Sequence, residues 1–461
     1  MENIKENKMG TAPMFGLILG MSLPAMFSML IQALYNIVDS IFVSNYTNEF
    51  LRDGDSLLSV NIAFPLQMVL MAVAIGSGVG VNSLIARRLG AKQQDRADSA
   101  ASHGFFISII NWFVFILIGL FLVKPFVGLY TNEEYIFESS VSYLSVVLIG
   151  SFGVSTSCMM EKMLQATGNM IMPMLSQLIG AVVNIALDPI FIYTLDLGVT
   201  GAAIATIIAQ HISAMLCFFF FFAKKQLVKI NIKGFRFKGS TLKNIYVVAV
   251  PAMVMQAIGS FMIMSINYII SITNEPTRVK DAATNVFGVY FKLQSFVFMP
   301  VFGLNQGSTP VIGYNYGAGD KKRMYSALKW AGLFAVIIMT LGFAAFQLFP
   351  EALMSMFAPS AEMLEIGTVA LRIISLCFIP AAIGIILTGL FQAVGKGIRS
   401  LIMSLLRQMC VIVPVAYFLS KTGIINMWYA FPIAEVVSLV VAILFFINLV
   451  KGDFSRLKPR A

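Results

Sequence analysis

Three acidic residues stand inside segments that are otherwise apolar. They are Asp39, Asp188 and Glu435. A charged side chain at the centre of a bilayer costs at least about 2.5–3.5 kcal/mol, and such residues persist where they are paired, hydrated or protonated. Carboxyl groups in this setting are suited to binding a proton or a metal cation, so these residues are the first candidates for a functional site.

Asp39 belongs to a polar stripe. Gln32, Tyr35, Asn36 and Asp39 follow one another at intervals of three, one and three residues. Residues three and four apart lie on the same face of a helix, so this spacing predicts one polar helix face that ends in a carboxylate.

Two further pairs carry oxygen atoms at helical spacing. Asn184 and Asp188 are four residues apart, and so are Thr206 and Gln210. If the three helices meet, carboxylate, amide and hydroxyl oxygens converge. Such a set suits a proton or a hard cation such as sodium, and no other metal is expected there. The alternative is that Asp39 and Asp188 only tie helices together through hydrogen bonds.

The elements that position these residues are membrane-spanning helices. The chain has 461 residues, of which 58% are apolar and 12% charged, whereas a soluble domain is about one-quarter charged. Apolar runs of about 20 residues are long enough to cross a hydrocarbon core as helices. Hydropathy predicts twelve, over residues 14–45, 57–85, 100–123, 137–162, 170–195, 199–223, 242–271, 284–312, 325–348, 362–393, 398–419 and 424–450.

The distribution of basic residues predicts the topology. Of the 32 Lys and Arg, 25 fall at the two ends of the chain and in segments that would share one side of the membrane, with Arg407 counted among them. Because basic residues accumulate on the cytoplasmic side, both termini should be cytoplasmic. The net charge of +10 therefore reflects topology, and no nucleic-acid partner is expected.

An internal repeat organises the chain. With a shift of 227 positions, Pro24-Ala25-Met26 falls on Pro251-Ala252-Met253, and Gly76 and Gly80 fall on Gly303 and Gly307. Because each copy holds an even number of helices, the repeat is parallel. The predicted organisation is an N-terminal six-helix lobe (1–223), a basic cytoplasmic linker (224–243), a C-terminal six-helix lobe (244–450) and a cytoplasmic tail (451–461).

The candidate acidic residues are not duplicated in the internal repeat. Asp39 falls on Ile266, and Asp188, after a two-residue shift, falls on Val413. A structural need for these carboxylates would have applied to both copies, so the asymmetry favours a functional role. Glu435 falls on Gln210 in the repeat. Both residues are secondary candidates for the site, and a packing role for Glu435 is as consistent with the sequence as a functional one. Pro24 removes a helix hydrogen bond and predicts a bend in the first helix.

Signatures of enzymes and ATP-driven pumps are missing from the sequence. There is no Walker loop, GxSxG, HExxH or CxxC. We expect neither an enzyme nor a cofactor, and an ATP-driven pump is disfavoured.

Several stretches resemble the multidrug and toxic compound extrusion (MATE) family, in its bacterial DinF/MepA-like branch. They are LPAMFSMLIQALYNIVDSIFVSNY, SLIARRLGAK, NIALDPIF, GYNYGAGDKKRM and QAVGKGIRSLIMSLLRQ. Together with the two six-helix halves, the resemblance covers nearly the whole chain. The carboxylates that other family members carry in helices seven and ten are not matched.

The resemblance implies a secondary multidrug antiporter of the bacterial plasma membrane. It would exchange H⁺ or Na⁺ for amphipathic, cationic compounds and act as a monomer in the bilayer. The family's cation-coupling residues correspond to Asp39, Asn184, Asp188 and Thr206, with Tyr35 nearby and Pro24 as the bend. Two alternatives remain: a flippase of a lipid-linked precursor, which would need a basic cavity, and a channel or sensor, which would not need an asymmetric carboxylate pair.

Overall fold

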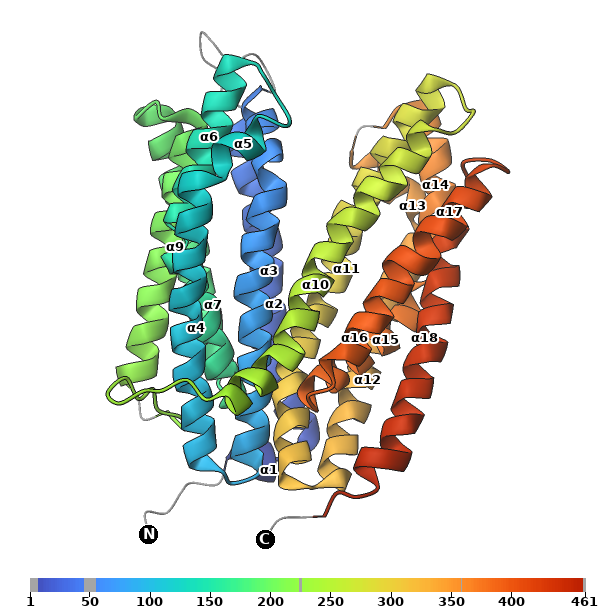
Figure 1. Ribbon diagram of the computed structural model, residues 1–461. Coiled ribbons are helices and arrows are strands. Elements are labelled where there is room, and N and C mark those ends of the chain that lie inside the picture. The colour runs from blue at the N-terminus through green and yellow to red at the C-terminus, as the bar shows by residue number, and fades with distance from the viewer. Residues whose placement is uncertain (1–6, 45–54, 224–225, 358, 459–461) are drawn as a thin grey trace. The chain divides into compact units, whose positions relative to one another are not determined.

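The computed structural model describes residues 7–44, 55–223, 226–357 and 359–458, except for the side chains of residues 36, 37, 40, 44 and 55–57. Every regular element in these ranges is helical (Figure 1). The first half contains α1 (Lys8–Thr11), α2 (Met14–Ser44), α3 (Asp55–Gly90), α4 (Gln94–Phe121), α5 (Val123–Val127), α6 (Glu134–Ile149), α7 (Phe152–Ala166), α8 (Ile171–Pro189), the π-helical turn η1 (Ile190–Thr194) and α9 (Gly198–Ala223).

The second half repeats this order. It contains α10 (Gly239–Ser271), α11 (Thr277–Ala318), α12 (Lys321–Leu348), α13 (Pro350–Ser355), α14 (Ala361–Ser375), α15 (Phe378–Ala393), α16 (Gly397–Leu405), the π-helical turn η2 (Leu406–Ile412), α17 (Val413–Ser420), the 3-10 turn η3 (Asn426–Tyr429), α18 (Ala430–Leu449) and η4 (Val450–Phe454).

The predicted all-α membrane fold is confirmed. Within the described residues, ten helices are long and apolar enough to cross a membrane, and two bent pairs raise the number to as many as twelve. The bent pairs are α6–α7, at 44°, and α14–α15, at 48°, which occupy corresponding places in the two halves. The longest helix, α11, has 42 residues, so at about 1.5 Å per residue it extends well beyond a hydrocarbon core about 30 Å thick.

The chain divides into two compact units whose boundaries lie inside helices. Unit 1 holds Phe27–Gln256, and unit 2 holds Lys8–Met26 together with Ala257–Ala461. The first helix of each half therefore begins in one unit and ends in the other. Both boundaries follow a proline, Pro24 in α2 and Pro251 in α10. The lobes expected from the repeat, 1–223 and 244–450, stay a prediction.

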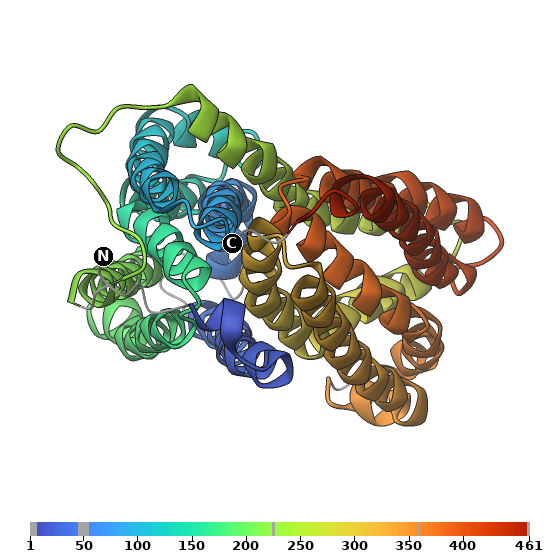
Figure 2. The ribbon, with the colours of Figure 1, turned by 90° about the horizontal axis from the view of Figure 1, so that it is seen from below.

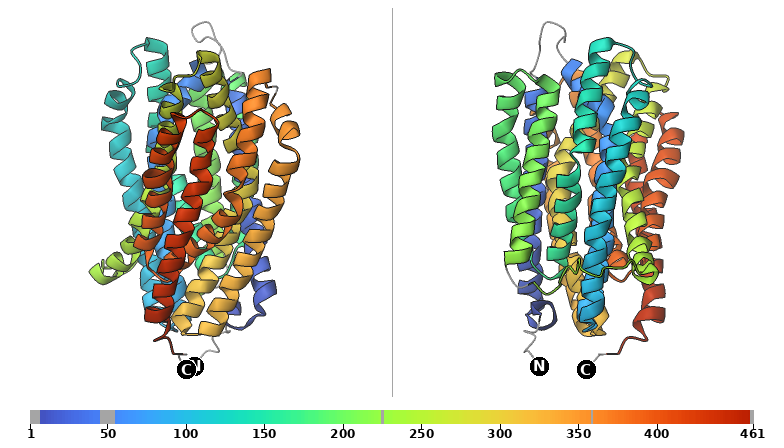
Figure 3. Two further views of the ribbon diagram at one scale, coloured as in Figure 1. Left: turned by 90° about the vertical axis from the view of Figure 1, so that its right-hand side faces the viewer. Right: turned by 60° about the vertical axis from the view of Figure 1, so that its left-hand side comes forward.

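Within unit 1, the beginning of α10 packs against two glycines of α3. A methyl group on Gly76 would lie 2.7 Å from the backbone nitrogen of Met253, and one on Gly80 would lie 2.5 Å from the carbonyl oxygen of Ile245. Glycine is needed here because the two backbones approach too closely for any side chain. The helices of each unit run side by side in Figures 2 and 3.

Unit 2 repeats this contact with α11 and the beginning of α2. A methyl group on Gly303 would lie 2.5 Å from the backbone nitrogen of Met26, and one on Gly307 would lie 2.6 Å from the Cα of Ser22. Ser22 Oγ also donates a hydrogen bond to the carbonyl of Leu304, at 3.4 Å. The four glycines and Met26 and Met253 obey the 227-residue shift, so the internal repeat is present in the packing as well as in the sequence.

Part of the basic linker packs along α4 in unit 1. Backbone N–H groups of the linker donate to α4 side chains: Lys229 to Asp98 Oδ1 at 2.9 Å, and Lys238 to His103 Nε2 at 2.8 Å. His103 Nδ1 lies 2.6 Å from the carbonyl of Ser99. Because Nε2 accepts a hydrogen bond, the ring is neutral in this arrangement, with its proton on Nδ1.

The glycine contacts predict a position-dependent effect of one methyl group. Gly303→Ala should lower the melting temperature, because overpacking a close contact costs about 1–3 kcal/mol. Gly288→Ala, in the same helix, is the matched control, since nothing lies within 4 Å of a methyl group there and alanine is the better helix former. Equal melting temperatures for the two variants would contradict the packing.

The topology is tested by reporter fusions. If both termini are cytoplasmic, a fusion after Ala223 should report the cytoplasmic side, and a fusion after Asn274 the opposite side. Signals from the same side would overturn the predicted orientation, since α10 alone separates the two fusion points.

Candidate cation-binding site

A pair of carboxyl groups forms the centre of the candidate site in unit 1. Asp39, in the last two turns of α2, and Asp188, at the end of α8, are in side-chain hydrogen-bonding contact. Asp188 is fully buried. Two carboxylates this close repel each other unless a proton or another cation lies between them. A proton or another cation bound at the pair would remove this repulsion.

An amide and a hydroxyl extend the pair. Asn184 Nδ2 donates to Asp188 Oδ1 at 3.1 Å and to Thr206 Oγ1 at 3.5 Å. Asn184 lies one turn before Asp188 on α8, and Thr206 lies on α9, which packs against α8 along its length. Both side chains are buried. The structure thus brings together the four residues predicted for cation coupling: Asp39, Asn184, Asp188 and Thr206.

Two tyrosines adjoin this group. Tyr35, one turn before Asp39 on α2, is hydrogen-bonded through its side chain to Thr206. Tyr143 of α6 is hydrogen-bonded to Gln67 of α3 and is close enough to Asp39 and Asp188 to interact electrostatically with them. Sequence reasoning missed Tyr143 and Gln67, because no spacing within one helix relates them to the carboxylates.

Three oxygen atoms of the site have no hydrogen-bond donor among the described residues. They are Asp39 Oδ1, Asn184 Oδ1 and Asp188 Oδ2, and all three are buried. Buried polar atoms in folded proteins almost always have a partner. Unpartnered oxygens from two carboxyl groups and one amide match the ligands of a hard cation, and one of the carboxyl oxygens could equally hold a proton.

Irregular backbone follows the site on α8. Asp188 is followed by Pro189, the last residue of α8, and the π-helical turn η1 begins at Ile190. Single π-helical turns often occur at functional sites. Within this turn, Tyr193 donates a hydrogen bond to the carbonyl of Phe42 at 2.6 Å, and the centroids of the two rings are 6.4 Å apart. This bridge joins the ends of α2 and α8 next to the carboxyl pair.

The remaining predicted residues are less well connected. Gln32 lies on α2, and the side chain of Asn36 lies outside the described residues. Gln210 lies one turn beyond Thr206 on α9, where its backbone carbonyl carbon would be 2.8 Å from a methyl group on Gly153. Their proposed supporting roles stay predictions.

In unit 2, Glu435 has a partner that sequence reasoning missed. Arg407 Nη1 donates to Glu435 Oε1 at 3.0 Å, and Glu435 is buried. Arg407 lies in the π-helical turn η2. The sequence placed Arg407 among the cytoplasmic basic residues, which stays a prediction, and in the structure its guanidinium group is paired with the buried carboxylate of Glu435. The signal for this pairing was a single arginine in the apolar run after Arg399.

A second polar cluster of unit 1 lies on α7. Glu161 Oε2 accepts a hydrogen bond from Gln177 at 2.6 Å, and Lys162 Nζ donates to Gln165 at 3.0 Å. The side chain of Lys162 packs against Gly78 of α3, where a larger residue would leave no room for it. A methyl group on Gly78 would lie 2.7 Å from Lys162 Cγ. No cluster of three or more His, Cys, Asp or Glu side chains that could hold a metal ion occurs among the described residues.

The fold and the site define a class of protein: a multi-pass membrane protein built from a repeated helical unit, with a pair of carboxyl groups in one copy. A profile described as MatE matches residues 24–190 and 251–418, one segment in each half. The chain belongs to the MATE family, whose members are transporters and not enzymes, and it is a multi-pass plasma-membrane protein.

Relatives and solved structures agree with this family. The multidrug export protein MepA of Staphylococcus aureus (strain NCTC 8325 / PS 47) is 26% identical over 434 residues, which are 94% of this chain and 93% of MepA. An outward-facing multidrug resistance MATE family transporter of the MOP superfamily has a TM-score of 0.90 and 27% identity, covering 98% of this chain and 99% of that one. A MATE crystal structure in complex with MaD3S has a TM-score of 0.89 and 26% identity, covering 97% and 98%.

The ion pair of unit 2 predicts a non-additive effect on stability. Arg407→Gln or Glu435→Gln alone should destabilise the protein by about 1.5–3 kcal/mol, because each leaves a charged group without its partner. The double variant Arg407→Gln/Glu435→Gln should lose less than the sum of the single variants. Thermal melting of the purified proteins measures this cycle, and additive losses would show that the pair is not coupled.

Proposed function

We propose that this protein is a secondary active multidrug efflux transporter, which exchanges H⁺ or Na⁺ for amphipathic cationic compounds across the plasma membrane. Membership of the MATE family and the similarity to MepA support efflux of small molecules. We further propose that the transporter acts as a monomer and needs no cofactor beyond the coupling ion.

One observation supports cation coupling most strongly. The carboxyl groups of Asp39 and Asp188 are in contact inside unit 1, and three oxygens at the site have no hydrogen-bond donor among the residues that the structure describes. A single proton or sodium ion would neutralise the pair and occupy these oxygens. We therefore assign Asp39 and Asp188 as the ion-binding groups, with Asn184 and Thr206 as the neutral side chains that orient them.

Exchange follows if the ion and the drug favour different conformations. A ligand shifts a conformational equilibrium only through its differential affinity for the two states. The carboxyl pair lies between α2 and α8. The first part of α2, up to Met26, belongs to unit 2, and the part that carries Asp39 belongs to unit 1. A change in the charge of the pair would alter the position of α2 and, through that helix, the state of the transporter.

The two rival functions have less support. A flippase for a pyrophosphate-linked lipid would need unpaired basic groups inside the helices, whereas Arg407 is neutralised by Glu435. A channel would have no need of a carboxyl pair in one copy of the repeat alone, since Ile266 and Val413 stand at the corresponding positions.

Efflux from proteoliposomes tests the proposal. With ethidium as the fluorescent cation, the parent protein should extrude dye when a proton or sodium gradient is imposed. Asp39→Asn and Asp188→Asn keep the shape of the side chain but cannot bind and release the ion, so each should abolish gradient-driven efflux while the protein stays folded.

Glu435→Gln is the comparison, because it removes a carboxylate from the other unit. Normalised to folded protein, it should retain gradient-driven efflux. If both aspartate variants transport at the parental rate while Glu435→Gln does not, the coupling site has been assigned to the wrong unit.

A further inference from the structure

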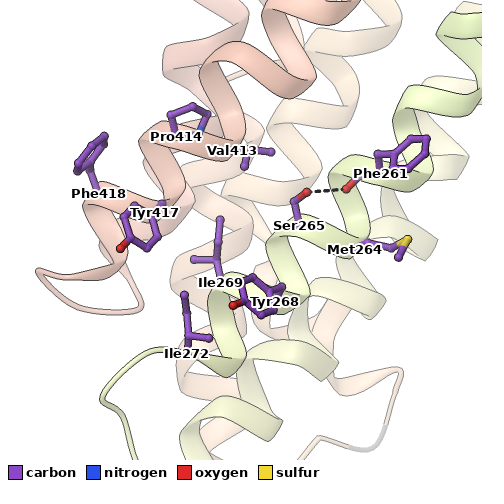
Figure 4. Close-up of a pocket in the computed structure, with 10 residues that line it drawn as sticks. All are labelled: Phe261, Met264, Ser265, Tyr268, Ile269, Ile272, Val413, Pro414, Tyr417 and Phe418. Carbon is purple, nitrogen blue, oxygen red and sulfur yellow. Dashed lines mark hydrogen bonds between the residues drawn. The ribbon is translucent and has the colours of Figure 1, made fainter.

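Unit 2 contains an open groove between α10 and the end of the α16–α17 span (Figure 4). Its volume is about 720 Å³, within the range of about 300–1,000 Å³ that is usual for small-molecule sites. The walls are mainly aromatic and aliphatic, and include Phe261, Met264, Tyr268, Ile272, Tyr417 and Phe418.

The apolar walls are exposed. The exposed fractions of Met264, Tyr268 and Phe418 are 65%, 66% and 65%. The groove is thus an apolar surface without a covering side chain among the described residues, and in a membrane-spanning protein such a surface faces the lipid.

Along α10, the groove is about as long as one leaflet of a bilayer is thick. From Phe261 to Ile272 the chain advances eleven residues along α10, or about 16 Å at about 1.5 Å per residue. Half of a hydrocarbon core about 30 Å thick is about 15 Å. The groove also runs to the ends of both helices, because α10 ends at Ser271 and α17 at Ser420.

A lysine stands at the end of the groove. Lys421 Nζ lies 4.6 Å from the ring centroid of Tyr417 and 5.8 Å from that of Phe418. Among the described residues, no Asp or Glu lines the groove. A cationic aromatic compound would find no countercharge there, whereas a molecule with an apolar chain and an anionic head would place each part against a matching surface.

The corresponding place in unit 1 is different. By the repeat, Phe418 corresponds to Tyr193 and Ile269 to Phe42, and in unit 1 the hydrogen bond between Tyr193 and the Phe42 carbonyl bridges the two helices. Phenylalanine has no hydroxyl group and cannot make this bridge. The repeated scaffold thus carries a bridged carboxyl pair in one copy and an open apolar groove in the other.

We propose that this groove is a binding site for an anionic glycerophospholipid, with one acyl chain between α10 and α17 and the phosphate at Lys421. Burial of the chain provides apolar contact along one leaflet, and Lys421 selects the anionic headgroup. The site is separate from the cation site of unit 1 and does not depend on which ion or compound is transported.

Native mass spectrometry of the full-length protein in detergent tests this site, with phosphatidylglycerol and phosphatidylcholine of equal chain length as probes. The parent protein should retain one phosphatidylglycerol about fivefold more strongly than phosphatidylcholine, as expected for one basic residue near an anionic lipid. Lys421→Gln should remove this preference. Ser265→Phe, which places a ring in the groove, should reduce retention of both lipids.

Lys124→Gln is the matched control, because Lys124 is an exposed lysine of unit 1. It should leave retention unchanged, and a parental melting temperature for Ser265→Phe shows that the fold is intact. Equal retention of the two lipids by the parent protein, or parental retention in both groove variants, would overturn the proposal. If tetraphenylphosphonium displaces the bound lipid and is itself lost in Ser265→Phe, the groove binds a cationic compound and the lipid assignment is wrong.

Discussion

Two carboxyl groups in contact inside a membrane protein cannot both remain ionised without a positive charge beside them. This constraint applies to Asp39 and Asp188, and the surrounding structure follows from it. α8 presents Asn184 and Asp188 on one face, α9 supplies Thr206, and α2 brings Asp39 and Tyr35 to the same place. An exchangeable cation at this point would link the charge of the pair to the position of α2.

The internal repeat separates what the fold needs from what the function needs. Both copies keep the close glycine contacts, Gly76 and Gly80 in unit 1 and Gly303 and Gly307 in unit 2. The chemistry is not shared: unit 1 has the carboxyl pair, whereas unit 2 has a neutralised Arg407–Glu435 pair and an apolar groove. The same close helix packing therefore constrains the sequences of both copies, whereas the buried charged residues differ between them.

The sequence predicts the parts of the site that lie along single helices. The stripe that ends in Asp39 and the Asn184–Asp188 spacing follow from helical periodicity, and the twelve spans follow from hydropathy. Tyr143, Gln67 and the Arg407–Glu435 pair could not be predicted in this way, because their contacts join different helices. The division of α2 after Met26 is also a property of packing, for which Pro24 was the only local sign.

Infrared difference spectroscopy can determine whether the Asp39–Asp188 pair holds one exchangeable cation. The spectrum of the parent protein minus that of Asp39→Asn/Asp188→Asn, in sodium-free buffer at neutral pH, isolates the two carboxyl groups. We predict one protonated carboxylic acid band and one carboxylate band, and the acid band should disappear on adding sodium if sodium is the coupling ion. Two carboxylate bands and no acid band in sodium-free buffer would contradict the account.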